Sequence, residues 1–204
     1  MNNKTQGALI LVVIIASILA VTVYLTDEPA QQQSVGTITG EPLPSAGTTI
    51  LIKSVKAFQD PNNSSQVSAL AIIVQPSGIG PTNFTCGQMT ISLTTPTASY
   101  TNVYAASDFV NASTFNNAYG GSFTNYQTVA SNCSIIELQG NGTQILEQGE
   151  QFAVFINLNS IHLDCPLQPN APFAVELIPS TPVKVTFTDN IPANITPVML
   201  LSGS

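Results

Sequence analysis

The sequence predicts an all-β immunoglobulin-like sandwich with one hydrophobic α-helix at the amino terminus. Three observations lead to this prediction. Residues 7–26 are apolar and uncharged, short alternating apolar runs fill the chain from residue 49 onward, and no later stretch keeps a helical period over any length. We therefore expect a hydrophobic helix over residues 1–26, an extended stalk or donor segment over 27–48, and a β-sandwich domain over 49–204.

The amino-terminal segment is long enough to cross a membrane. Residues 5–26 carry no charge and would span roughly 33 Å as a helix, at about 1.5 Å per residue. Lys4 precedes the segment, whereas Asp27 and Glu28 follow it. This asymmetry predicts insertion into the cytoplasmic membrane with the amino terminus inside and the rest of the chain outside. A removed signal, a permanent anchor and a filament-forming helix all agree with this pattern.

Residues 27–48 have the composition of a stalk. Pro29, Pro42 and Pro44 prevent a continuous helix, and the Gln, Gly and Ser content favours an extended chain. Residues 34–39 could form a short strand, which would pair either with its own domain or with that of a neighbour.

The strands of the sandwich are predicted from runs of apolar residues at every second position, bounded by Gly and Pro turns. Residues 67–74 are apolar on both faces, as expected for a central strand. The other predicted strands lie at residues 50–55, 89–94, 135–138, 152–158, 173–177, 183–187 and 198–201. Several short strands with turns between them favour a sandwich.

Residues 95–126 show the weakest periodicity, and we expect long loops or an outer hairpin there. The aromatic residues of this region are Tyr100, Tyr104, Phe109, Phe115, Tyr119, Phe123 and Tyr126. An outward-facing contact surface is one interpretation, because aromatic side chains dominate interfaces. We favour the other interpretation, in which they pack a second small core.

Composition excludes a nucleic-acid partner and points to the cell exterior. Only 7% of residues are charged, the chain has no Arg, and the net charge is −7. Asn-x-Ser/Thr sequons are more frequent than chance predicts, so we expect dense N-glycosylation beyond the helix. A first sequon, at Asn3, precedes the helix; the candidate acceptors beyond it are Asn62, Asn63, Asn83, Asn111, Asn132, Asn141 and Asn194.

No cluster of residues predicts catalysis, a cofactor or a metal site. Cys86, Cys133 and Cys165 would give one disulfide and one thiol outside the cell, with the pairing left open. His162, the only His, lies in a polar loop between strands. Glu147 and Glu150 flank a turn at Gly149, where acids are usually solvated. We therefore expect a protein that is not an enzyme.

Three stretches together resemble the archaeal archaellin and type IV pilin-like superfamily. GALILVVIIASILAVTVYL resembles the helix that packs into the filament core. SAGTTILIKSVKAF and VSALAIIVQPSGIGP resemble the first two strands of the archaellin outer domain. ILEQGEQFAVFINLNS with LQPNAPFAVELIPSTPVKVTF is similar to the closing strands of that domain. Residues 95–126 have no counterpart in this resemblance.

The resemblance implies a structural subunit of an archaeal cell-surface filament, an archaellum or a pilus, that forms a helical homo-oligomer. The residues expected in the filament core are Ile10, Leu11, Val13, Ile14, Ile18 and Val21. The candidate processing site is the bond between Gln6 and Gly7. The alternative is a membrane-anchored archaellum-associated (stator) or S-layer-binding envelope protein with the same sandwich. A third possibility is a donor-strand thread pilin, in which residues 34–39 complete the sheet of the next subunit.

Overall fold

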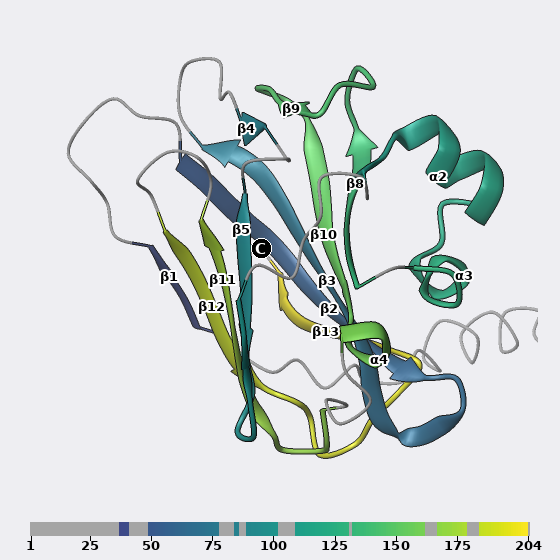
Figure 1. Cartoon of the computed structure of the whole chain (residues 1–204), viewed down its shortest axis with the longest axis vertical. Coiled ribbons are helices and arrows are strands. Elements are labelled where there is room, and N and C mark those ends of the chain that lie inside the picture. Colours follow the sequence, from purple (N-terminus) through teal and green to yellow (C-terminus); the bar gives the residue numbers. More distant parts are fainter. Residues whose placement is uncertain are drawn as a thin grey trace, which may run out of the picture. The chain divides into compact units, whose positions relative to one another are not determined.

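The computed structural model describes residues 37–40, 49–77, 84–85, 89–101, 109–130, 132–161, 167–178 and 184–203 (Figure 1). All of them belong to the compact unit Gln32–Ser204. The apolar segment at residues 7–26, with its core and processing residues, lies outside the described residues. Within the described ranges, no helix is both long enough and apolar enough to cross a bilayer.

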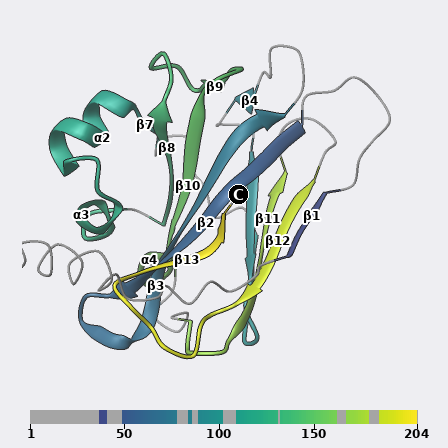
Figure 2. The same ribbon diagram turned by 180° about the vertical axis from the view of Figure 1, so that it is seen from behind.

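Two antiparallel sheets make up most of the described structure, and we call them sheet A and sheet B (Figures 1 and 2). Sheet A has the spatial order β1 (Thr37–Gly40), β12 (Val185–Asn190), β11 (Pro172–Ile178), β5 (Thr90–Thr94) and β6 (Ser99–Tyr100). Sheet B has the order β13 (Val198–Gly203), β2 (Thr49–Asp60), β3 (Asn63–Ser77), β10 (Gln151–Asn157), β8 (Cys133–Gln139) and β7 (Phe109–Val110), of which only β7 pairs in parallel. The short strands β4 (Phe84–Thr85) and β9 (Ile145–Leu146) pair with each other.

The main core lies between the two sheets, as in a β-sandwich. Phe152, Val154 and Ile156 of β10 point into it from sheet B, and Val175 and Leu177 of β11 from sheet A. All five side chains are fully buried. Alternation along these strands places every second residue in this core, which is why the apolar pattern of the sequence located the strands correctly.

A second, smaller core covers the other face of sheet B and forms a third layer. It is built by α2 (Ala112–Tyr119) and α3 (Phe123–Gln127), which Figure 1 shows beside β8 and β10. A further short helix, α4 (Leu158–Ile161), follows β10. The expectation of loops or an outer hairpin was therefore wrong for residues 112–127. The expectation that no helix follows the amino-terminal segment was also wrong.

Small side chains on sheet B make room for the aromatic layer. The members of the second core include Ala69, Ala71 and Ala153 on the sheet, and they meet aromatic rings from α2 and α3. Phe155 of β10 stacks on Phe123, with ring centroids 5.9 Å apart and an interplanar angle of 6°. The strand β3 is thus buried on both faces, as its continuous apolar run predicted, because it separates two cores.

Most of the described aromatic residues within positions 95–126 pack a second core. Phe115 and Tyr126 are buried in it, and Tyr119 and Phe123 pack against it. Phe109 instead packs against the main core, and Tyr100 lies in β6. Tyr104 lies outside the described residues. The preference for a second core over an outward-facing surface is therefore confirmed for the helical part of the region.

The strand expected at residues 34–39 is found at Thr37–Gly40 and pairs within its own chain. It lies antiparallel to β12 at one edge of sheet A, with Ile38 opposite Phe187. Its partner is thus a strand of the same chain in this structure.

Candidate functional site

Several residues singled out in the sequence lie outside the described residues, namely Cys86, Cys165, His162, Asn83 and the acceptor Asn3. Cys133 is described and is fully buried in the main core, where it begins β8. Among the residues that the structure describes, no group of three or more His, Cys, Asp or Glu side chains could hold a metal ion.

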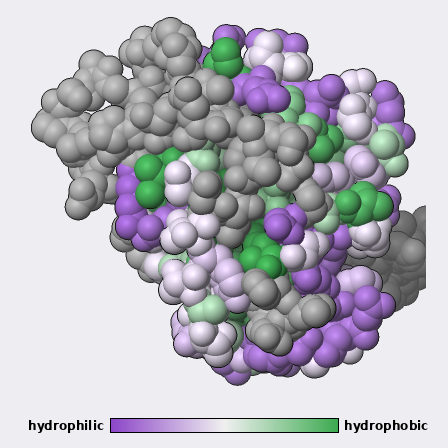
Figure 3. Space-filling model, in the orientation of Figure 1, coloured by the Kyte–Doolittle hydropathy of each residue, from purple (hydrophilic) through white to green (hydrophobic). Residues whose placement is uncertain are grey.

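The sequon asparagines in the described part lie in turns or at the ends of strands and helices, and none lies within a strand of sheet A. Asn62 and Asn63 form the tip of the β2–β3 hairpin, and both are exposed. Figure 3 shows hydrophilic residues gathered at the lower right, where Figure 1 places this hairpin. Asn141 and Asn194 are exposed in the turns after β8 and β12. These positions leave the amide groups accessible from solvent.

Two further sequons are more constrained. The side chain of Asn111 caps α2, because its Oδ1 accepts a hydrogen bond from the backbone N–H of Thr114 at 2.7 Å. Asn132 is exposed, but Ser134 of the same sequon is fully buried. The Ser134 hydroxyl accepts a hydrogen bond from the Tyr126 hydroxyl at 2.8 Å.

The turn that follows β8 is held by two buried carboxylates. Glu137 is 1% exposed, and its carboxylate accepts hydrogen bonds from the backbone N–H of Ala112 (2.9 Å) and of Gly142 (2.6 Å). Glu150 is 8% exposed and accepts from the N–H of Asn141 (3.0 Å) and of Glu147 (2.8 Å). The two carboxylates are therefore used to satisfy backbone donors and to join α2, the β8–β9 turn and β10.

The expectation that both turn-flanking acids are solvated holds for Glu147, which is exposed, and was wrong for Glu150. Sequence reasoning missed Glu137 entirely. No sequence signal marks it; the structure shows that Gly140 leaves room for it, because a methyl group at Gly140 would overlap Glu137 Oε1.

The outer face of sheet A is rich in hydroxyl groups and has little charge. We call it the threonine face and define it by Thr90, Ser92, Thr94, Thr186 and Thr188, which alternate with core-facing residues along β5 and β12. Thr94 and Thr188 are exposed, Thr90 and Thr186 are half-buried, and Ser92 is buried. The register places Thr94 and Thr188 on either side of Ala174, and Ser92 and Thr186 on either side of Glu176. Threonine suits this position because its branched side chain favours a strand and its hydroxyl group is hydrated without charge.

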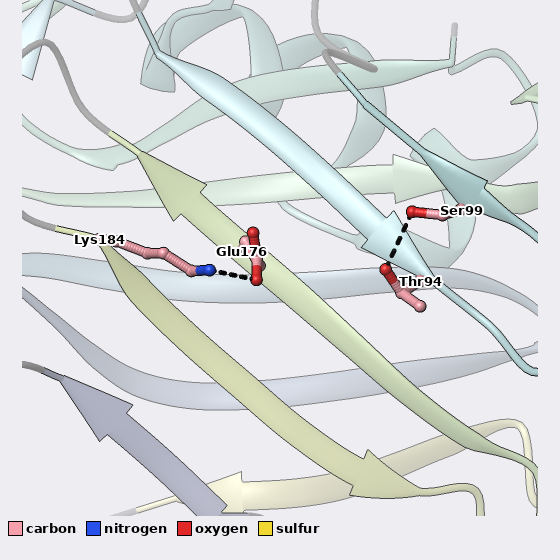
Figure 4. A network of polar contacts seen from close by, with 4 residues as sticks. All are labelled: Thr94, Ser99, Glu176 and Lys184. Atoms are coloured by element: carbon pink, nitrogen blue, oxygen red, sulfur yellow. Dashed lines mark hydrogen bonds and ion pairs between the residues drawn. The ribbon is translucent and has the colours of Figure 1, made fainter.

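Figure 4 shows the polar contacts of the threonine face. Lys184, just before β12, forms an ion pair with Glu176 of β11. Thr94 and Ser99 share a hydrogen bond of 3.2 Å between β5 and β6. Both side chains of the ion pair are partly exposed, 51% for Lys184 and 33% for Glu176, so water screens the attraction and its contribution to stability is small. Among the described residues of this face, Glu176 is the carboxylate at an outward position, and it is paired with Lys184.

A depression of about 470 Å³ opens at the end of sheet A where β5, β11 and β12 meet. Its lining residues are mostly Thr and Pro, with Phe173 at its apolar side and Asp189 as its carboxylate. It contains no nucleophile paired with a base, which acyl or glycosyl transfer would require.

A β-sandwich with sequons on its turns and a sheet face of little charge, preceded in the sequence by an apolar segment, agrees with the structural domains of cell-surface assemblies. The comparisons with known proteins give the family. A family model for archaeal-type flagellin matches residues 8–189, so the chain belongs to the archaeal-type flagellin (archaellin) family. This family consists of structural subunits of extracellular surface filaments and not of enzymes.

The fold agrees with a solved structure of the same family. The chain is similar to the crystal structure of archaeal flagellin FlaB1 from Methanocaldococcus jannaschii, with a TM-score of 0.62 and 13% sequence identity. The similarity covers 77% of this chain and 98% of that chain. No curated protein sequence matches this chain. The predicted β-sandwich and the predicted resemblance to archaellins are both confirmed.

Proposed function

We propose that this chain is a structural subunit of an archaeal surface filament that polymerises through its amino-terminal segment and carries a glycosylated, immunoglobulin-like sandwich on the outside. The observation that supports this most strongly is the extent of the family match. It begins at residue 8, and thus includes the apolar segment as well as the strands up to β12.

The proposed mechanism is assembly by burial of the apolar segment. Once a helix of this composition leaves the membrane, its sides must be covered by copies of itself, because contact with water would be unfavourable for its whole surface. Repeated head-to-tail contacts that do not close on themselves build a helical polymer. We assign the filament core to Ile10, Leu11, Val13, Ile14, Ile18 and Val21, the residues that carry the apolar surface of the segment.

This proposal assigns a separate role to each of three parts of the chain. Residues 1–26 would enter the cytoplasmic membrane first and then the filament core. Residues 27–48 would link core and sandwich, with β1 (Thr37–Gly40) joining the edge of sheet A, and residues 49–204 would face the exterior. Glycans on the exposed sequons at Asn62 or Asn63, Asn141 and Asn194 would form a hydrated outer layer. No described residue suggests a cofactor for this function.

The test compares wild type with Ile14→Asp in the cells that produce the protein. A carboxylate in the centre of the filament core has no partner, so filaments should disappear from negatively stained cells while the sandwich still folds. Mass spectrometry of the filament subunit should find an amino terminus at Gly7. Abundant protein without filaments in wild type would overturn the proposal, and a retained Met1 in that case would support the anchored envelope protein instead.

A further inference from the structure

We infer that the threonine face is a contact surface between neighbouring copies of this chain in the assembled filament. This inference rests on the filament function proposed above and adds to it the part of the sandwich that meets the next subunit. The partner is a second copy of the chain, whose sandwich packs against the outer side of β5, β11 and β12. Two observations support the choice of this face, and a third, its size, restricts the contact to the assembled filament.

The first observation is charge. The chain has 11 acidic and 4 basic residues, so copies brought together repel each other unless their contact surfaces are neutral. On the threonine face the carboxylate of Glu176 is paired with Lys184. The nearest other carboxylate in the described strands, Asp189, has an inward register position opposite Phe173 at the end of β12. The centre of this face, around Glu176, can therefore meet another acidic copy without placing like charges opposite each other, whereas Asp189 lines the depression beside Thr94 and Thr188 at its end.

The second observation is the placement of the sequons. The sequences of β1, β5, β6, β11 and β12 contain no Asn-x-Ser/Thr, although the chain is rich in such sites. The described acceptors lie on the β2–β3 hairpin, before α2 and β8, and in the turns after β8 and β12. A glycan is bulky and hydrated and would hold a neighbouring subunit away. A sheet face without acceptors can come into close contact.

The third observation is size. With strands about 4.8 Å apart and residues about 3.3 Å apart, three strands of five residues cover roughly 240 Å². A stable protein pair needs about 800 Å² per partner. The threonine face is thus too small to hold two free copies together, whereas a polymer that is already joined elsewhere can use many such contacts. Contact through this face is therefore expected within the filament.

The opposite side of the sandwich provides the matched control. Thr124 is exposed in the first turn of α3, on the far side of sheet B from the threonine face. A carboxylate is favourable near a helix amino terminus, so Thr124→Glu adds the same charge without disturbing the fold. Thr188→Glu places that charge on the threonine face, and Thr188→Gln places a neutral side chain of the same length there.

The experiment counts filaments per cell by negative-stain microscopy, with full-length chains expressed at equal abundance. Wild type, Thr124→Glu and Thr188→Gln should form filaments in similar number. Thr188→Glu should form at least about tenfold fewer, because like charges face each other at every subunit contact. Filaments of Thr188→Glu at the wild-type number overturn this inference alone, whereas the absence of wild-type filaments overturns the proposed function.

Crosslinking keeps the inference testable if Thr188→Glu fails to accumulate. Benzoylphenylalanine in place of Thr94 should crosslink neighbouring subunits in purified filaments after illumination, and benzoylphenylalanine in place of Thr124 should not. Dimers from position 94 support the contact. Dimers only from position 124, or crosslinks from position 94 only to a different envelope protein, overturn it.

Discussion

At the scale of single residues, Glu137 shows how this sandwich uses a charge in its interior. The side chain is 1% exposed, yet both oxygens of its carboxylate have a backbone N–H donor, one from the start of α2 and one from the β8–β9 turn. A buried carboxylate is costly unless such donors compensate the lost hydration. Glu137 therefore fixes two segments that are remote in sequence.

Replacement of the Glu137 carboxylate should lower the free energy of unfolding, and replacement of an exposed carboxylate should not. Glu137→Gln leaves an amide NH₂ group facing a backbone N–H, so one donor loses its acceptor, and we expect a loss of about 2 kcal/mol in the free energy of unfolding. Urea unfolding of the detergent-solubilised chain, followed by circular dichroism, measures this loss. Glu147→Gln is the control, because Glu147 is exposed, and should change the free energy by less than about 0.5 kcal/mol. Equal effects of the two substitutions would contradict this role for Glu137.

The sequons should differ in occupancy if glycans are transferred to the folded domain. Asn141 and Thr143 are both exposed, whereas the Ser134 hydroxyl of the Asn132 sequon is buried and bonded to Tyr126. We therefore expect glycopeptide mass spectrometry of native filaments to find Asn141 modified more completely than Asn132. Full occupancy at Asn132 would instead mean that transfer precedes folding of β8.

At the scale of elements, the strands were predictable and the helices were not predicted. Alternation of apolar residues is a local signal, and it located β5, β10 and β11 because one face of each points into the main core. The helices α2 and α3 have eight and five residues, too short for a periodic signal to stand out. Their caps were nevertheless present in the sequence, with Asn111 and Ser122 at the amino ends and Gly120, at φ 63°, ending α2.

The contacts of the buried carboxylates lie beyond what one sequence can predict. Glu137 and Ala112 are 25 residues apart, and no local pattern brings them together. The same holds for the threonine face, whose rows of hydroxyl groups appear only when the register of β5, β11 and β12 is known. Local periodicity predicts which side chains of a strand face the core. The order and register in which strands pair depend instead on the packing of the whole domain.

The helical layer should detach without unfolding of the sandwich. Phe115 of α2 is 3% exposed and contacts the rings of Tyr119, Phe123 and Tyr126. Phe115→Ala removes the centre of that layer, at a cost of about 3 kcal/mol, and helices this short are not stable alone. Hydrogen exchange should then become at least about tenfold faster in residues 109–130, while β10 and β11 keep their protection. The exposed Asn116→Ala is the control, and uniform loss of protection would show that the two cores unfold together.

At the scale of the whole molecule, the proposed function divides the work of assembly between two parts of the chain. The unit Gln32–Ser204 contains the described sandwich and every acidic residue except Asp27 and Glu28. By strand geometry its threonine face offers roughly 240 Å² of surface with little charge, below the about 800 Å² per partner that a stable pair buries. The apolar segment must then supply most of the free energy of assembly, because burial contributes about 25 cal/mol per Å².

This division predicts the behaviour of a chain that begins at Gln32. Without the apolar segment, the remaining unit should stay monomeric up to about 100 μM, because a small neutral contact does not offset the cost of association and the repulsion between acidic copies. Sedimentation velocity at two protein concentrations and two salt concentrations measures this. Circular dichroism confirms that the truncated chain is folded. Filaments or stable oligomers of the truncated chain would show that the sandwich itself drives assembly, and the filament core would then have to be assigned to β strands in place of residues 7–26.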